Sequence, residues 1–315
     1  MEIVLVVFQA LFVLMISPLV MGWLNNCRLW LQNKSAPGIF QPYRNLRKLF
    51  QKETLIAHHA SIIYRVTPYI QIGCMVFAAM LIPIFSVNLF ASNAADLIAL
   101  AGLFGFARFF LALAGMDIGT SFGNLGSRRE MFVSFLAEPC LLMIFFGVSL
   151  LANSTSLSTV STYLITHPLQ IYPSLVFMFF AFLIVMLAEN SRLPVDNPST
   201  HLELTMIHEA MILEYSGRHL ALIQWSCDLK FVIYSLIGIS IFMPWGIPIA
   251  ITPLSFFIGL ISCVIKLFLG ATFIVCLEST MAKLRIFRVT EFLSIGFLLA
   301  VLGILLHLLL TLRVS

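Results

Sequence analysis

Residues 131–152 read MFVSFLAEPCLLMIFFGVSLLA, an apolar run of 22 residues in which Glu138 is the only charged side chain. A helix needs about 20 mostly apolar residues to cross the hydrocarbon core of a bilayer, so this run predicts a transmembrane helix. Backbone groups in hydrocarbon must be hydrogen-bonded within their own segment, which excludes an open strand. The stretch therefore places the chain among helical membrane proteins.

The rest of the chain repeats this pattern. Further apolar runs of spanning length occur at about 3–24, 68–90, 95–115, 170–188, 231–250, 254–277 and 292–312. With 60% hydrophobic and only 10% charged residues, a chain of 315 residues cannot hide its apolar surface inside one water-soluble globule. We therefore expect an all-α integral membrane protein with about eight transmembrane helices in a single membrane domain, residues 1–315.

Lysine and arginine lie in alternate connections between these runs. The loops after the first, third, fifth and seventh runs hold Arg28, Lys34, Arg44, Arg47, Lys48, Lys52, Arg65, Arg128, Arg129, Arg192, Arg218, Lys283, Arg285 and Arg288. The loops after the second, fourth and sixth runs hold neither residue type. Because positive residues are retained in the cytoplasm, we expect the first set of loops inside and both termini outside. The small net charge of +4 gives no reason to expect a nucleic-acid partner.

The first inner loop has the pattern of an amphipathic helix at about 42–53. One helical stripe holds Tyr43, Leu46, Leu49 and Phe50, while Arg44, Arg47, Lys48 and Lys52 point away from it. A basic helix with such a stripe lies in the lipid headgroup layer. The alternative is an ordinary solvated loop helix, and the proline at its start together with the clean stripe favours the interfacial one.

The third inner loop, at about 189–230, is the most polar part of the chain and longer than a connector needs. Its acidic, basic and aromatic candidates for function are Glu189, Arg192, Asp196, Glu203, Glu214 and Tyr215. Long loops of this kind are usually functional or packed against another part of the structure. A zinc-hydrolase site is not expected, because an HExxH helix needs a second histidine where the stretch from His208 places Ile212. The six cysteines form no CxxC pair, so an iron–sulfur cluster or structural zinc is not expected either.

Three ionisable residues lie inside the apolar runs. They are Arg108 in the third run, Glu138 in the fourth and Lys266 in the seventh. Charged side chains are costly in hydrocarbon and must be paired, hydrated or neutralised. Ion pairs that only hold the bundle together are one explanation. The three together with an acidic inner loop favour a hydrated polar path.

Four strings together resemble one known family. They are QPYRNLRKLFQKE at 41–53, AEP at 137–139, LAENSRLPVD at 187–196 and HLELTMIHEAMILEYSG at 201–217. They are similar to the subunit of respiratory complex I that roofs the quinone chamber, in the branch found in membrane-bound hydrogenases of the formate hydrogenlyase and hydrogenase-4 type. The resemblance covers nearly the whole chain.

The resemblance implies a subunit that performs no bond chemistry and binds no redox cofactor. Such a subunit anchors a soluble arm, with hydrogenase-like large and small subunits that carry nickel–iron and iron–sulfur centres, in the bacterial inner membrane. It joins that arm to antiporter-like subunits that move H⁺ or Na⁺. By the same resemblance, the charged path is assigned to Glu138, Glu189, Arg192, Asp196, Glu203, Glu214 and Tyr215, with Arg108 and Lys266 added from their position in the spans. Arg128 and Arg129, with Arg44, Arg47 and Lys48 of the amphipathic helix, are expected to face the partner.

Some positions depart from the quinone-reducing branch. Residues 33–38, NKSAPG, stand where that branch typically has Arg-x-Gly-Pro-Asn, and His201 and His208 are additions in a longer inner loop. These departures favour the hydrogenase branch. A quinone-site subunit of a proton-pumping NADH dehydrogenase is the alternative within the same superfamily. From another class, the chain is compatible with a free-standing secondary transporter that uses Arg108, Glu138 and Lys266 as its substrate path.

Overall fold

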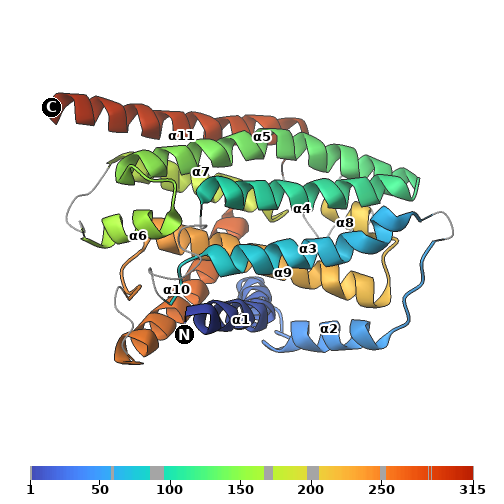
Figure 1. Cartoon of the computed structure of the whole chain (residues 1–315). Helices are drawn as coiled ribbons and strands as arrows, with labels where there is room; N and C mark the ends of the chain where they lie inside the picture. Colours follow the sequence, from blue (N-terminus) through green and yellow to red (C-terminus); the bar gives the residue numbers. More distant parts are fainter. Residues whose placement is uncertain are drawn as a thin grey trace.

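In a computed structural model of the chain, the described residues form a bundle of α-helices without a strand (Figure 1). The described residues are 2–57, 60–85, 96–166, 173–196, 206–248, 253–282, 284 and 286–314. Their helices are α1 (Glu2–Leu31), α2 (Gln41–Gln51), α3 (Ile62–Leu81), α4 (Leu97–Asp117), α5 (Ser121–Ala152), α6 (Leu157–Thr166), α7 (Pro173–Glu189), α8 (His208–Ile212), α9 (Gly217–Phe242), α10 (Pro253–Thr280) and α11 (Ile286–Val314).

Seven of the described helices, α1, α3, α4, α5, α9, α10 and α11, are long and apolar enough to cross a membrane. The remaining predicted span corresponds to α7, which has 17 residues, and residues 170–172 at its expected start lie outside the described part of the chain. A helix of 17 residues is at the short end of the range that spans a bilayer, about 17–25 residues. The predicted class, an all-α membrane protein, is confirmed.

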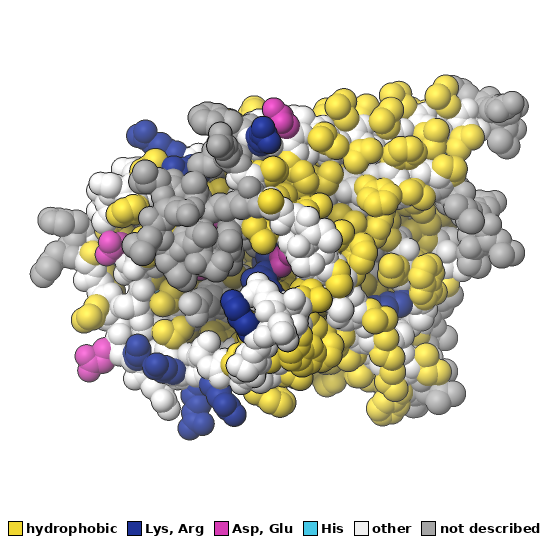
Figure 2. All heavy atoms as spheres, turned by 180° about the vertical axis from the view of Figure 1, so that it is seen from behind, with side chains coloured by type: hydrophobic (Ala, Val, Ile, Leu, Met, Phe, Trp, Pro, Cys, Tyr) yellow, Lys and Arg dark blue, Asp and Glu magenta, His cyan; other side chains and the backbone are white. Residues whose placement is uncertain are grey.

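Consecutive spans run in alternate directions. The side-chain amide of Gln9, near the start of α1, donates to the carbonyl oxygen of Ala79 near the end of α3, at 2.9 Å. At the other end of the bundle, Arg28 of α1 pairs with Glu278 near the end of α10. Figure 1 draws α2 and α8 at this second end, away from both chain termini. Figure 2 shows most of the Lys and Arg side chains on this face toward one end of the molecule and mainly apolar side chains toward the other end. We call the end with α2 and α8 the inner end; its cytoplasmic location stays a prediction.

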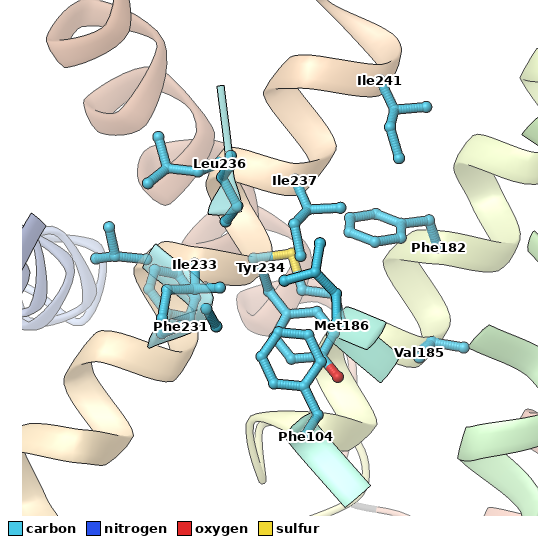
Figure 3. Close-up of a cluster of buried hydrophobic side chains, with 14 of the residues drawn as sticks. Phe104, Phe182, Val185, Met186, Phe231, Ile233, Tyr234, Leu236, Ile237 and Ile241 are labelled. Atoms are coloured by element: carbon cyan, nitrogen blue, oxygen red, sulfur yellow. The ribbon is translucent and has the colours of Figure 1, made fainter. Parts of the chain in front are cut away.

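Helix α9 passes through the centre of the bundle. Its residues Phe231, Tyr234 and Ile237 are fully or almost fully buried, and Figure 3 shows Tyr234 beside Phe104 of α4, with Ile237 toward Phe182 of α7. The rings of Phe104 and Tyr234 stack with their centroids 4.6 Å apart. These ring contacts pack α4, α7 and α9 against one another.

The predicted boundary between the polar inner loop and the sixth span is wrong. The sequence predicts that the loop reaches residue 230, but α9 begins at Gly217 and ends at Phe242. In the sequence, the charged residues Asp228 and Lys230 interrupt the apolar run and make the span look as if it begins after them. Lys230 is tolerated within the helix because its ammonium group lies 3.1 Å from a carboxylate oxygen of Glu189. Pairing across helices thus extends the span beyond its apolar part.

Helix α2 lies along the inner end of α1 and α9. It buries Leu46 and leaves Arg44, Arg47 and Lys48 exposed, as the apolar stripe predicts. Phe50 meets Trp225 of α9 edge to face, with ring centroids 6.3 Å apart. The chain enters α2 directly over Gly22 of α1, where a Cβ atom would overlap the carbonyl oxygen of Ile39.

We predict that Gly22→Ala destabilises the protein by about 1–3 kcal/mol, because overpacking forces the backbone before α2 away from α1. The matched control is Gly73→Ala in α3, where an added Cβ atom meets nothing within 4 Å. Alanine has the higher helix propensity, so the control is expected to be neutral or slightly stabilising. Thermal unfolding in detergent measures both variants. Equal unfolding temperatures for them would contradict the close contact.

Candidate functional site

Arg108 is the centre of a buried charge cluster. Its side chain comes from the middle of α4 and is only 5% exposed. The guanidinium group pairs with Glu189 at the end of α7, and its Nε lies 3.2 Å from Oε1 of Glu130 in α5. The guanidinium group also donates to the hydroxyl of Ser134, one helical turn after Glu130 in α5. It lies 3.9 Å from Oε1 of Glu138, one turn further on. One cation is therefore shared by three carboxylates from two helices.

Lys230 of α9 is the second cation of the cluster. Its ammonium group donates to the backbone oxygen of Glu189 at 2.7 Å and lies 3.1 Å from the Oε2 of the same residue. The cluster thus contains Arg108, Lys230, Glu130, Glu138 and Glu189, which is two positive against three negative groups, or −1 when all are ionised. Charges in low dielectric interact strongly, by about 4 kcal/mol for a pair 4 Å apart at an effective dielectric constant near 20. A change at one member is therefore felt by the others.

A second ion group lies beside the first. Glu278 of α10 accepts from Arg28 of α1, and its Oε1 lies 3.6 Å from Arg192, which follows α7. Arg192 also stacks over the ring of Phe231, 5.0 Å from its centroid. Burial lowers the pKa of Arg192, and the carboxylate of Glu278 acts in the opposite direction. These contacts tie α1, α10 and the segment after α7 together at the inner end.

Three neighbouring hollows surround the charge cluster. The central cavity, about 90 Å³, is lined by Arg108, Glu130, Glu189, Arg192 and Lys230 among others. A water molecule needs at least about 10–15 Å³ of such space, so this cavity has room for several.

The other two hollows lie on either side of the central cavity. A cavity of about 240 Å³ toward α2 shares Met21, His208 and Cys227 with it. A third hollow, about 270 Å³, holds Glu138 and Tyr234 and shares Phe104 and Glu189 with the central cavity. The shared lining residues therefore place the three hollows next to one another, between α2 and Glu138.

His208 stands between the inner and central cavities. It begins α8, and its Nε2 lies 3.2 Å from the thiol sulfur of Cys227. Burial lowers the pKa of His208, but Cys227, Glu130 and Glu209 raise it more, so that the pKa is about 9 against an ordinary value of 6.5. These neighbours therefore favour the protonated imidazole, which adds a positive charge at the rim of the cluster.

Two of the predicted site residues hold the backbone around the cluster. Asp196 is buried, and its Oδ2 accepts from the backbone nitrogens of Ile207 and His208, both at 3.3 Å. It thereby fixes the start of α8. Tyr215 stacks on Tyr64 with ring centroids 4.0 Å apart and donates its hydroxyl to the Tyr64 carbonyl oxygen at 3.0 Å. Burial is the main cause that raises the pKa of Tyr215, so its hydroxyl stays protonated.

The structure brings Arg108, Glu138 and Glu189 together and places Arg192 on the same cavity. Lys266 lies elsewhere: its ammonium group donates to the carbonyl oxygens of Met243 and Trp245, beyond the opposite end of α9. Glu214 is exposed in the turn after α8. Glu203 lies outside the described residues.

The residues expected to face a partner lie at the inner end. Arg44, Arg47, Lys48 and Arg128 are exposed there. Arg129 instead donates to the carbonyl oxygen of Met206 at 3.1 Å, so it holds the segment before α8 against α5. We call the four exposed residues the basic rim; they lie on α2 and near the start of α5.

Sequence reasoning missed three charged members of the two ion groups: Glu130, Lys230 and Glu278. Each lies in the first or last turns of an apolar run or just outside it, where charged residues are ordinarily solvated. A signal was present, since no proline or glycine separates Glu130 or Lys230 from the apolar run that follows it. Among the described residues, no group of three or more His, Cys, Asp or Glu side chains is placed to hold a metal ion.

We predict that Arg108→Gln costs about 3–5 kcal/mol of stability, because it leaves buried carboxylates without their counter-charge. The double variant Arg108→Gln with Glu189→Gln should regain part of this loss. Arg65→Gln, which removes an exposed arginine from α3, is the control and should change stability by less than about 0.5 kcal/mol. Denaturation in detergent measures all three. An Arg108→Gln protein as stable as the control would show that the cluster does not hold the helices together.

The pKa of His208 also predicts a pH dependence. A pKa raised by folding stabilises the folded protein fully below about 6.5, and this contribution is lost as the pH rises through about 9. The unfolding temperature should therefore fall between these values in the wild type and fall less in His208→Gln. Cys227→Ala removes the nearest partner and should move the midpoint to lower pH. Superimposable curves for wild type and His208→Gln would refute the assignment.

The sequence of the chain is similar to those of known proteins. A profile described as "NADH dehydrogenase" matches residues 2–309. "Formate hydrogenlyase subunit 4" of Escherichia coli K12 is 31% identical over 88% of this chain and 90% of its own length. "Hydrogenase-4 component C" of the same organism is 31% identical over 94% of this chain and 92% of its own length.

More distant relatives carry a different name. A subunit of the NADH-quinone oxidoreductase of Rhodospirillum rubrum is 26% identical over 79% of this chain and 73% of its own length. A chain in the structure of the membrane-bound sulfane sulfur reductase, described as an archaeal respiratory membrane complex, superposes with a TM-score of 0.78. That match covers 95% of this chain and 98% of the other at 18% sequence identity, so it bears on the fold alone.

Proposed function

Because the chain belongs to the NADH dehydrogenase family of membrane oxidoreductase subunits, we propose that it anchors and couples a multi-subunit membrane-bound hydrogenase of the formate hydrogenlyase and hydrogenase-4 type. In this proposal it joins a soluble redox arm to ion-translocating, antiporter-like subunits in the bacterial inner membrane. The higher identity to the two hydrogenase-type relatives, 31% against 26% for the relative named after NADH-quinone oxidoreductase, favours this branch.

The soluble arm would dock on the inner end. The exposed basic rim of Arg44, Arg47, Lys48 and Arg128 supports this, since charged rims guide the association of partners and exclude wrong ones. The arm would supply hydrogenase-like large and small subunits with their nickel–iron and iron–sulfur centres. The present chain would then bind no redox cofactor and would contribute only charged and protonatable groups.

The observation that carries the coupling role is that one guanidinium, Arg108, is shared by three carboxylates. With Lys230 the cluster has one carboxylate more than it has cations, so it can take up one proton and become neutral. If the charge near His208 and Glu189 changes when electrons pass through the docked arm, the balance of Arg108 between Glu189, Glu130 and Glu138 shifts with it.

In this proposal Glu138 is the residue that passes the proton from the charge cluster to a neighbouring subunit. Its carboxylate is 44% exposed and lies in the hollow that adjoins the face of α4 and α5, whereas Glu130 and Glu189 are buried. A group that is both coupled to Arg108 and open to its surroundings is suited to pass a proton onward. The antiporter-like subunits are therefore expected on the α4 and α5 side of the bundle.

We predict that Glu138→Gln lowers the number of ions moved per hydrogen molecule formed, while hydrogen formation itself continues. Glutamine keeps the size of the side chain but cannot carry the proton. Glu291→Gln, an exposed carboxylate near the inner start of α11, is the matched control and should leave the ratio unchanged. The ratio is measured in inverted membrane vesicles from the acidification or sodium uptake that accompanies hydrogen formation. If Glu138→Gln moves as many ions per hydrogen molecule as the wild type, the coupling role is rejected.

Purification from membranes tests the branch. Nickel–iron and iron–sulfur subunits isolated with this chain support the hydrogenase assignment, and bound quinone together with NADH oxidation supports the NADH dehydrogenase assignment instead. A chain that is isolated alone and moves a solute into vesicles would make it a free-standing transporter. The last two outcomes each reject the proposal.

A further inference from the structure

A groove runs along α9 between α7 and α10, which both pack against α9. It encloses about 460 Å³ and is lined mainly by apolar side chains, including Phe179, Phe182, Met186, Ile239 and Phe273. Volumes of about 300–1,000 Å³ are typical of sites that bind small molecules. The groove is separate from the charge cluster, because none of the five cluster residues lines it.

One cation marks the end of this groove. Lys266 of α10 lines it, and its ammonium group donates to the carbonyl oxygen of Met243 at 2.7 Å and to that of Trp245. The same group lies 5.7 Å from the centre of the largely exposed Trp245 ring. An ammonium group has three donors, so these two carbonyls leave one donor for an acceptor outside the protein.

Lys266 has no carboxylate partner within 4 Å among the described residues, in contrast to Arg28, Arg108, Arg192 and Lys230. The sequence supplies none nearby either. Residues 82–96, 153–172 and 243–252, which connect the helices at this end, contain a single acid, Asp96. That carboxylate accepts from the backbone nitrogen of Ile98 at 3.1 Å and begins α4. The other acid at this end is Glu2 at the start of α1, six residues before Phe8, whose ring meets Phe256 ten residues before Lys266 in α10, so the start of α1 lies away from Lys266. A cation in apolar surroundings requires a counter-charge, so the anion has to come from outside the chain.

The position of Lys266 in the bundle indicates which kind of anion pairs with it. Met243, whose carbonyl oxygen accepts from Lys266, directly follows the last residue of α9. Met243 is 13 residues after Lys230, which corresponds to about 20 Å along a helix. The ammonium group therefore reaches the end of α9 that is opposite the inner end, although Lys266 itself belongs to the middle of α10. Trp245 beside it is a residue type enriched at the membrane surface, where lipid phosphates are found.

We propose that this groove binds a phospholipid of net negative charge, with one acyl chain along α9 and the phosphate on Lys266. The charge of the phosphate supplies the missing anion, and the apolar lining receives the chain. A zwitterionic lipid is a poorer ligand because its own cation competes with Lys266. The site does not depend on the redox role proposed above.

The test uses the full-length protein, stripped of lipid in detergent, and native mass spectrometry with phosphatidylglycerol or phosphatidylcholine. The wild type should retain phosphatidylglycerol preferentially. Lys266→Gln keeps a donor for the carbonyls but removes the charge, and should weaken phosphatidylglycerol binding about fivefold, with little effect on phosphatidylcholine.

Gly270→Phe tests the groove without touching Lys266. Gly270 lines the groove, and a Cβ atom there meets nothing within 4 Å, so phenylalanine should fold normally and fill the space for the acyl chain. Binding of both lipids should drop about tenfold, as a filled cavity excludes its ligand. Gly73→Phe, at an equally open glycine of α3, is the control and should bind like the wild type.

Three outcomes would overturn the proposal. They are equal binding of both lipids by the wild type, equal lipid binding by Gly270→Phe and Gly73→Phe, and release of the lipid by inorganic phosphate alone. A photo-reactive residue in place of Gly270 gives a further result: cross-linking to lipid in membranes supports the site, and cross-linking to a neighbouring protein instead rejects it.

Discussion

A guanidinium group in the membrane interior must be paired, and the inner half of this bundle is built around that requirement. Arg108 projects from the middle of α4 into the space between α5 and α7, where an unpaired cation would cost several kcal/mol. Glu130 and Glu189 meet it from those two helices. Glu189 is in turn held by Lys230 of α9. Four helices are therefore joined by one set of charges, and each helix must keep its register for the set to close.

The small helix α8 closes the inner side of this cluster, and glycines make its close approach possible. A Cβ atom at Gly126 of α5 would lie 2.9 Å from the Cβ atom of Ala210, and one at Gly115 of α4 would lie 3.3 Å from that of Met211. Asp196 fixes the start of α8 from the other side. Arg108, Glu130 and Glu189 are buried, so their charges interact more strongly than at the surface. His208 is the residue of α8 that reaches both the cluster and the inner cavity.

The cations at the two ends of the bundle have different partners. At the inner end, the buried or partly buried cations Arg28, Arg108, Arg192 and Lys230 each meet a carboxylate of the protein itself. At the other end, Lys266 meets only backbone carbonyls among the described residues. An internally paired set can respond to a change of protonation at one of its members. An ammonium group with an open donor instead has to take its anion from the surroundings.

The sequence by itself determined the class of the protein. Apolar runs long enough to span a bilayer are a local property, and so is the alternation of basic and neutral loops. The stripe of α2 was equally readable, because Leu46 and its basic neighbours alternate at helical spacing. The motif strings identified the family, and Arg108, Glu138 and Glu189 were found because charges in or next to apolar runs are rare.

Only the tertiary structure decided which charges belong together. Glu130, Lys230 and Glu278 look like solvated residues in a window of sequence, since burial depends on helices that lie far away along the chain. Lys230 became part of a span because Glu189 of another helix pairs with it. Lys266 looked like a member of the same path, and it lies apart because α10 places it beyond the far end of α9. Sequence spacing sets the face of a helix, whereas the partner on that face is set by packing.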